Sequence, residues 1–211
     1  MKSHLYLIRH GETDWNRSER LQGHSDIELN DLGRDQASRL RPFAEKLHID
    51  VLAASDLKRA VATARLAFPS VSEIITDPRL REVHLGEAEG TNRHDLEKLF
   101  GKEILRAWFS TEPDDMKHRF PGGESRAEAL VRITDCLTEI LRTHGTDERR
   151  HAKGGPIKIA CVTHGLVIRT LTQSIVGEYR PEFRAPNCAV FEYEFDHPSQ
   201  KMSFKTIHLL P

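Results

Sequence analysis

The feature that most constrains the fold is a recurring short apolar run with a helical pattern after it. Such runs occupy residues 5–8 ("LYLI"), 50–55 ("DVLAAS") and most of 157–165 ("IKIACVTHG"). A strand that is apolar along its length is buried on both faces, as in parallel sheets covered by helices. The alternation of strands with helices therefore predicts an α/β fold, with a doubly wound, mostly parallel sheet and helices on both faces.

The other patterns fill in the order of the elements. Helices are expected at residues 30–47, 57–68, 124–144 and 166–176, with Asn30 as a candidate N-cap and a kink or early break at Pro42. Residues 73–77 are a further strand candidate. Two segments near the end of the chain alternate apolar and polar residues, which predicts an antiparallel pair. The polar stretch 145–156 is expected to be a mobile loop.

The domain organisation is expected to be simple. No repeat or compositional boundary divides the chain, so residues 1–211 are expected to form one domain. Residues 84–124 are charged and irregular, with short helices expected around 95–100 and 104–109. We expect this segment to be a lid or an insertion rather than a second domain.

Composition limits the partners. With 31 basic and 32 acidic residues, the formal charge is −1, which gives no signal for nucleic-acid binding. The apolar runs are too short to span a membrane, and the first of them stops at Arg9, so no signal peptide is expected. Three widely spaced cysteines without CxxC spacing favour free thiols in the cytoplasm over a disulfide framework or a zinc site.

Polar functional residues follow the predicted strands. Arg9 and His10 come directly after the first strand, and Arg59 lies one turn into the helix after the second. His164 ends the 157–165 strand, and Glu82 follows the strand candidate at 73–77. Ligands of open α/β sheets bind outside the carboxyl ends of the strands. These side chains are therefore expected to meet at one edge of the sheet.

Such a set suits phosphoryl transfer. Arginine binds phosphate oxygens in bidentate fashion, and a neutral imidazole can attack phosphorus. A carboxylic acid can protonate the leaving alkoxide, and a neighbouring dianionic phosphate favours its protonated form. We therefore expect His10 as nucleophile, Arg9 as a phosphate clamp and Glu82 as proton donor. Gly11 is expected to admit close backbone approach, and Asn16 to donate an amide hydrogen bond to the phosphate.

The stretch "LIRHGETDWN" resembles the signature of the histidine phosphatase superfamily, which includes the cofactor-dependent phosphoglycerate mutases. Nearly the whole chain takes part, through "RLQG", "SDLKRAVATA", "LREVHLGEAEG", "FPGGES", "CVTHGLVIR" and "PNCAV". The resemblance implies a phosphohistidine on His10, no metal or organic cofactor in the phosphatase branch, and Glu82 as proton donor. It also implies these phosphate or substrate contacts: Arg9, Asn16, Gln22, Gly23, Arg59, His164 and Gly165.

The resemblance leaves phosphatase and mutase open. A mutase must exclude water and needs cations for the substrate carboxylate, and the mutases carry an arginine pair in a longer segment after the acid. Here residues 90–121 form a short segment without such a pair, so we favour a phosphatase. The substrate is expected to be a small phosphorylated metabolite, of the sugar phosphate, fructose-2,6-bisphosphate or α-ribazole phosphate class. Ala88, where relatives often carry an aromatic residue, is expected to widen the pocket.

Two other classes of protein are compatible with parts of the sequence. One is a metal-dependent hydrolase built from the 12 histidines, but no compact motif such as HExxH is present and no metal site is expected. Another is an interaction protein that binds phosphorylated ligands without turnover, which the intact His10 and Glu82 disfavour. Members of the resembled family occur in several oligomeric states, and a monomer or homodimer is expected here.

Overall fold

The computed structural model describes residues 1–146 and 155–209, and it contains a six-stranded mixed sheet. The strands stand in the order β3-β2-β4-β1-β5-β6. Neighbours among β3, β2, β4 and β1 are parallel, whereas β5 is antiparallel to β1 and β6 is antiparallel to β5. The parallel centre with an antiparallel terminal pair confirms the predicted α/β class. The bounds are β1 Lys2–Arg9, β2 Val51–Ala54, β3 Ile75–Thr76, β4 Ile157–Thr163, β5 Val190–Asp196 and β6 Lys201–His208.

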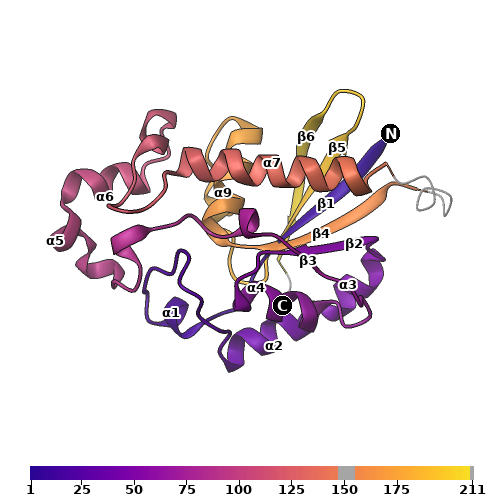
Figure 1. Cartoon of the computed structure of the whole chain (residues 1–211), viewed down its shortest axis with the longest axis horizontal. Coiled ribbons are helices and arrows are strands. Elements are labelled where there is room, and N and C mark those ends of the chain that lie inside the picture. Colours follow the sequence, from indigo (N-terminus) through magenta and orange to yellow (C-terminus); the bar gives the residue numbers. More distant parts are fainter. Residues whose placement is uncertain (147–154, 210–211) are drawn as a thin grey trace.

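Helices cover both faces of the sheet (Figure 1). One face carries α2 (Asp31–Arg39), α3 (Arg41–Leu47) and α4 (Lys58–Ala67), and the other carries α7 (Arg126–His144) and α9 (Gly165–Val176). The short α1 (Asp14–Arg17) follows β1. Within residues 1–146 and 155–209, no helix has the length and apolar character needed to cross a membrane.

The core consists of two layers because successive strand residues point to opposite faces. Along β1, Leu5 and Leu7 pack into the cluster under α7 and α9, while Tyr6 and Ile8 pack into the cluster under α2, α3 and α4. All four side chains are buried. The continuous apolar run "LYLI" is therefore explained by burial on both faces of a central strand.

The predicted helix at 30–47 is two helices in the structure. Asn30 caps α2 as expected, and its side chain accepts a 2.8 Å hydrogen bond from the Gly33 amide. The break falls at Leu40, just before α3, which begins with Pro42 in its first turn. Proline lacks the amide hydrogen that an unbroken helix would need, but it is tolerated in a first turn.

The predicted strand at 73–77 is shorter in the structure, and the predicted loop at 145–156 is only partly described. The strand predicted at 73–77 contains only two residues, because Asp77 caps the 3-10 helix η1 (Pro78–Leu80) and Pro78 ends the strand pattern. The polar stretch 145–156, expected to be a mobile loop, lies mostly outside the described residues.

The segment 84–124 lies beyond the carboxyl ends of the parallel strands, where Figure 1 shows α5 and α6. Trp108 and Phe100 pack against Phe120, with ring centroids 4.9 and 5.1 Å apart, and Leu96 is fully buried. These side chains belong to the same buried cluster as those under α7 and α9, so the segment is anchored to the main core. Its elements are η2 Gly86–Ala88, η3 Arg93–Asp95, α5 Leu96–Phe100, α6 Lys102–Phe109 and η4 Pro113–Lys117.

Candidate active site

A cavity of about 170 Å³ lies at the carboxyl ends of β1 and β2. Gly165 lines the adjoining, larger cavity. The His164 ring lies beside that of His10, with centroids 5.1 Å apart. The structure thus brings all the residues that were predicted to bind or transfer phosphate to one place. Those that line the smaller cavity are Arg9, His10, Asn16, Gln22, Gly23, Arg59 and Glu82.

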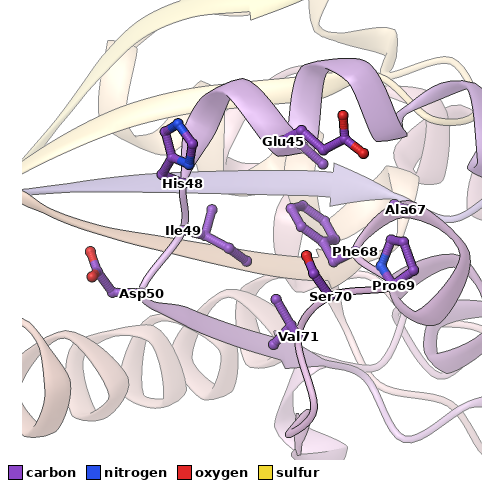
Figure 2. A pocket seen from close by; sticks show the side chains of 10 residues that line it. Glu45, His48, Ile49, Asp50, Ala67, Phe68, Pro69, Ser70 and Val71 are labelled. Carbon is purple, nitrogen blue, oxygen red and sulfur yellow. The ribbon is translucent and has the colours of Figure 1, made fainter.

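A different cavity, of about 340 Å³, is shown in Figure 2. It lies at the amino end of β2, the opposite end of that strand from Arg59 and the start of α4, and Ala67 at the end of α4 contributes to its lining. Its charged or titratable lining consists of Glu45, His48 and Asp50, and the Asp50 carboxylate accepts the Lys158 amide at 3.0 Å. Without an arginine in its lining, this cavity does not offer the phosphate-binding chemistry found at the other end of the sheet.

His10 is buried and held in one tautomer. Its Nδ1 lies 2.6 Å from the Gly11 carbonyl oxygen, which can only accept, so Nδ1 carries the proton and Nε2 carries the lone pair. Burial lowers the pKa of His10 well below its usual range, and the charges of Arg59 and Arg9 lower it further. The ring is therefore a neutral imidazole, the form required of a nucleophile.

Arg59 and His164 form a buried pair behind His10. Arg59 is fully buried and donates to the carbonyls of Ser25 (2.7 Å) and Gly23 (2.8 Å), while its Nε donates to His164 Nδ1 at 3.3 Å. Burial lowers the pKa of Arg59 to about 10, so it stays charged at neutral pH. The His164 proton is then on Nε2, which is buried without a partner among the described residues. That N–H is available to a phosphoryl oxygen.

Arg9 lies against the start of α9. Its Nη1 donates to the Ala185 carbonyl at 2.7 Å, and its buried Nε has no partner among the described residues. A Cβ on Gly165 would lie 3.1 Å from that Nε, so a glycine there gives the guanidinium room. Within the described part of the chain, neither Arg9 nor Arg59 has a carboxylate within ion-pair distance. Their charges are left for an incoming anion.

Two more positions require glycine. At Gly11 a Cβ would lie 2.3 Å from the Gly33 carbonyl oxygen, so the glycine admits the close approach of the backbone at the start of α2. Gly23 has φ +51°, and a Cβ there would lie 2.2 Å from Glu89 Oε1. This left-handed turn places the Gly23 carbonyl on Arg59.

Asn16 and Gln22 each present an amide group to the cavity. The Asn16 Oδ1 accepts from the amide and the hydroxyl of Thr13, both at 3.2 Å. Its NH2 group is thereby left over for another acceptor. Gln22 is buried, and its Oε1 has no partner among the described residues.

Glu82 is held at the amino end of α9. Its carboxylate accepts from the amides of Leu166 (2.9 Å), Val167 (3.1 Å) and Val83 (3.0 Å). A helix N-terminus with free amides stabilises a carboxylate. Its backbone carbonyl is bound as well, by Arg132 Nη2 at 2.7 Å. Glu82 is therefore anchored at both ends beside the cavity.

Three supporting residues were not predicted. The Thr63 hydroxyl accepts from the Gly11 amide at 3.0 Å and donates to the Arg59 carbonyl at 2.7 Å, which links the two strand ends. Arg132 comes from α7 and binds the carbonyls of residues 79, 81 and 82. Trp108 lines the cavity from the 84–124 segment. Local patterns gave no signal for these contacts, because each residue reaches the site from a distant segment or helix face.

The arrangement offers a neutral imidazole lone pair, two arginines without carboxylate partners, a free imidazole N–H and one anchored carboxyl group. These are the groups that in-line phosphoryl transfer through a covalent intermediate requires. In residues 1–146 and 155–209, no three or more His, Cys, Asp or Glu side chains gather in a way that could hold a metal ion.

The sequence and the structure of the chain are similar to those of known proteins. The sequence pattern of the histidine phosphatase superfamily (branch 1) matches residues 5–206. A glucosyl-3-phosphoglycerate phosphatase of Mycolicibacterium vanbaalenii is 34% identical over 174 residues, which cover 82% of this chain and 74% of that protein. The probable phosphoglycerate mutase GpmB of Enterobacter sp. (strain 638) is 33% identical over 196 residues, covering 90% and 84%. The structure of mycobacterial glucosyl-3-phosphoglycerate phosphatase with VO3 superposes with a TM-score of 0.77 at 25% identity, covering 97% and 98%.

Proposed function

The chain belongs to the histidine phosphatase superfamily (branch 1), and from this premise we propose that it hydrolyses small phosphomonoesters through a phosphohistidine on His10. The observation that carries the proposal is the state of His10 itself. The ring is buried and neutral, its tautomer is fixed by Gly11, and it lies beside Arg9 and Arg59, which have no carboxylate partners in the described chain.

In the first step, the His10 Nε2 lone pair attacks phosphorus and the bond to the leaving oxygen breaks. Arg9, Arg59, the Nε2–H of His164 and the Asn16 amide bind the charge on the phosphoryl oxygens. The leaving alkoxide takes a proton from the carboxyl group of Glu82, which lines the cavity. The products of this step are the free alcohol and phosphohistidine.

In the second step, water attacks the phosphohistidine. Glu82, now a carboxylate, takes one proton from that water, and the bond between phosphorus and His10 Nε2 breaks. Inorganic phosphate leaves and Glu82 is again an acid. The same residue thus serves as proton donor and as base, which its position beside the cavity allows.

Access of water supports a phosphatase over a mutase. The smaller cavity shares walls with an outer cavity of about 370 Å³, whose lining includes the exposed residues Glu19, Arg93 and Arg184. In a mutase, the phosphohistidine must persist while the bound sugar acid reorients, and at such an open site water would hydrolyse it. The names of the relatives include both activities, so cofactor-dependent phosphoglycerate mutase activity is the alternative.

The proposal extends to the cellular compartment, the oligomeric state and the kind of substrate. The three cysteines are buried free thiols, which suits a cytoplasmic enzyme. The chain would act as one domain, a monomer or homodimer, on a small phosphorylated metabolite, without nucleic acid, membrane or cofactor. The 84–124 segment, which carries Trp108 to the cavity, would cover the substrate as a lid.

The test is phosphate release from p-nitrophenyl phosphate and from a panel of alkyl phosphomonoesters, with a strong chelator present. Turnover is expected. His10→Ala is expected to abolish turnover and the formation of an acid-labile phosphohistidine on the protein. Glu82→Gln should slow alkyl esters far more than the aryl ester, because p-nitrophenolate leaves without a proton.

Three outcomes would contradict the proposal. Interconversion of phosphoglycerates without phosphate release would indicate the mutase. Tight binding of phosphorylated compounds without turnover would indicate an interaction protein. Equal losses on alkyl and aryl esters in Glu82→Gln would remove Glu82 from the role of proton donor.

A further inference from the structure

The outer cavity has an excess of positively charged residues, with more arginines than carboxylates in its lining. Arg9 and Arg20 line it, and three further arginines come from separate segments: Arg93 in η3, Arg169 in α9 and Arg184 at the end of η5 (Pro181–Arg184). In residues 1–146 and 155–209, none of the three has a carboxylate within ion-pair distance. Many arginines of the described chain are ion-paired, for example Arg81 with Asp56 at 2.6 Å, whereas Arg20 and Arg41 donate to backbone carbonyls. The three arginines are distinguished by lining one cavity together.

The three side chains are close enough to act on one another. Burial lowers the pKa of Arg169, Tyr179 and Glu82 raise it, and the charges of Arg93 and Arg184 lower it by smaller amounts. The Arg93 guanidinium is held over the Phe109 ring, with Cζ 4.6 Å from the ring centroid. Gathering like charges is unfavourable unless an anion is bound between them.

The two carboxylates that line this cavity bind groups other than the three arginines. Glu82 accepts the amides of Leu166 and Val167, as described above. Glu19 is exposed and lies 3.0 Å from His94 Nε2. Neither carboxylate is paired with one of the three arginines.

The cluster lies next to the phosphate site. Arg169 follows Gly165 by four residues in α9, so both lie on one face of the helix, and both line the outer cavity. Arg9 lines both cavities and connects them. A phosphomonoester bound at His10 would therefore extend toward Arg169.

We propose that Arg93, Arg169 and Arg184 form a subsite for a second anionic group of the substrate, either a carboxylate or a second phosphate. The inference rests on the proposed function and narrows its substrate class to phosphomonoesters that carry another negative charge. It also revises the sequence-based argument about cations. Residues 90–121 contain no arginine pair, yet the fold collects three arginines from separate segments.

The test compares substrates that differ in one group. 3-Phosphoglycerate carries a carboxylate where glycerol 3-phosphate carries a hydroxymethyl group. Propane-1,3-diol bisphosphate and its monophosphate form the second pair, which tells a phosphate preference from a carboxylate preference. We expect kcat/KM for the doubly anionic member of one pair to exceed that of its partner at least tenfold, as for a charged hydrogen bond of about 1.5–3 kcal/mol.

Single substitutions test which arginines cause the preference for the doubly anionic substrate. Arg169→Gln and Arg184→Gln should each bring the ratio of kcat/KM within the preferred pair close to one. Arg39→Gln removes an exposed arginine of α2 that pairs with Asp35 and should leave the ratio as it is. An unchanged ratio in Arg169→Gln and Arg184→Gln, or no preference in either pair of substrates, would overturn the inference.

Binding to the His10→Ala variant separates this inference from the proposed function. Calorimetry would measure the dissociation constants of the same four compounds without turnover. A tenfold preference for a doubly anionic compound, lost in His10→Ala/Arg169→Gln, supports the subsite even if the wild-type enzyme releases no phosphate. Turnover of p-nitrophenyl phosphate with equal binding within both pairs would leave the phosphatase standing and reject the subsite.

Discussion

The neutrality of His10 predicts a pH dependence of stability that a single substitution can isolate. Burial first, and then the charges of Arg59 and Arg9, lower the pKa of His10 in the folded state. The unfolded state regains a histidine pKa of about 6.5, so it binds more protons than the folded state once the pH falls below that value. Acidification therefore lowers the free energy of unfolding, and the contribution of His10 to stability is fully present only above a pH of about 6.5.

The magnitude follows from proton linkage. If folded His10 stays neutral down to pH 5, its unfolded form gains protons between pH 6.0 and 5.0 at a cost of about 1.2 kcal/mol in the free energy of unfolding. With an m value of about 2.5 kcal/mol per M urea, the midpoint would fall by about 0.5 M. Every other titrating group adds its own shift to the wild-type value, so a variant is needed as the reference.

The assay is urea unfolding of the wild-type protein and His10→Gln at pH 6.0 and 5.0. The wild-type protein should lose about 1.2 kcal/mol more than the variant, since glutamine cannot titrate. His164→Gln, which removes the neighbouring buried ring, serves if the first variant does not fold, and the pKa of His164 is lowered by burial in the same direction. Equal losses in wild type and variants would show that folding does not lower the pKa of these histidines, and would refute the argument that burial keeps His10 neutral.

Other substitutions test the framework of the site. Arg59→Lys should lower kcat/KM by about 10²–10³, because one ammonium group cannot keep the three hydrogen bonds of a planar fork, and steady-state kinetics would measure this. Gly165→Ala should raise KM for phosphate esters with little change in the melting temperature, because the added Cβ would lie 3.1 Å from Arg9 Nε and displace the guanidinium. Arg132→Gln should slow alkyl esters more than p-nitrophenyl phosphate, since it frees the backbone that holds Glu82. A loss of thermal stability with equal effects on both kinds of ester would instead mean that Arg132 only supports the fold.

The parts of the site that lie next to strand ends were predictable from the sequence. Arg9, His10 and His164 stand where an apolar run stops, and parallel strands bring such ends together. Arg59 lies in the second position of α4, just after β2. Because the strand pattern was strong, the position of these residues followed from it without knowledge of side-chain contacts.

The supporting contacts were not predictable because they join distant segments. Arg132 contacts the Glu82 carbonyl across 50 residues of sequence, and its own helix pattern marks it only as a polar position of α7. The same applies to the cluster of Arg93, Arg169 and Arg184, each of which reads as an ordinary charged residue in its own segment. A sequence pattern reports periodicity within an element, whereas such clusters depend on how loops after different elements are packed.

The way the site holds its charges explains why it can receive a phosphate. Arg9 and Arg59 are fixed by carbonyl oxygens, which orient a guanidinium without cancelling its charge. The carboxylate of Glu82 is in turn fixed by backbone amides of α9 rather than by these arginines. An ion pair between Glu82 and either arginine would have to be broken before phosphate could bind, at a cost comparable to the binding it makes room for. Holding each charge by neutral dipoles instead keeps the donors oriented toward the cavity before the substrate arrives, which is the preorganisation that electrostatic stabilisation of phosphoryl transfer requires.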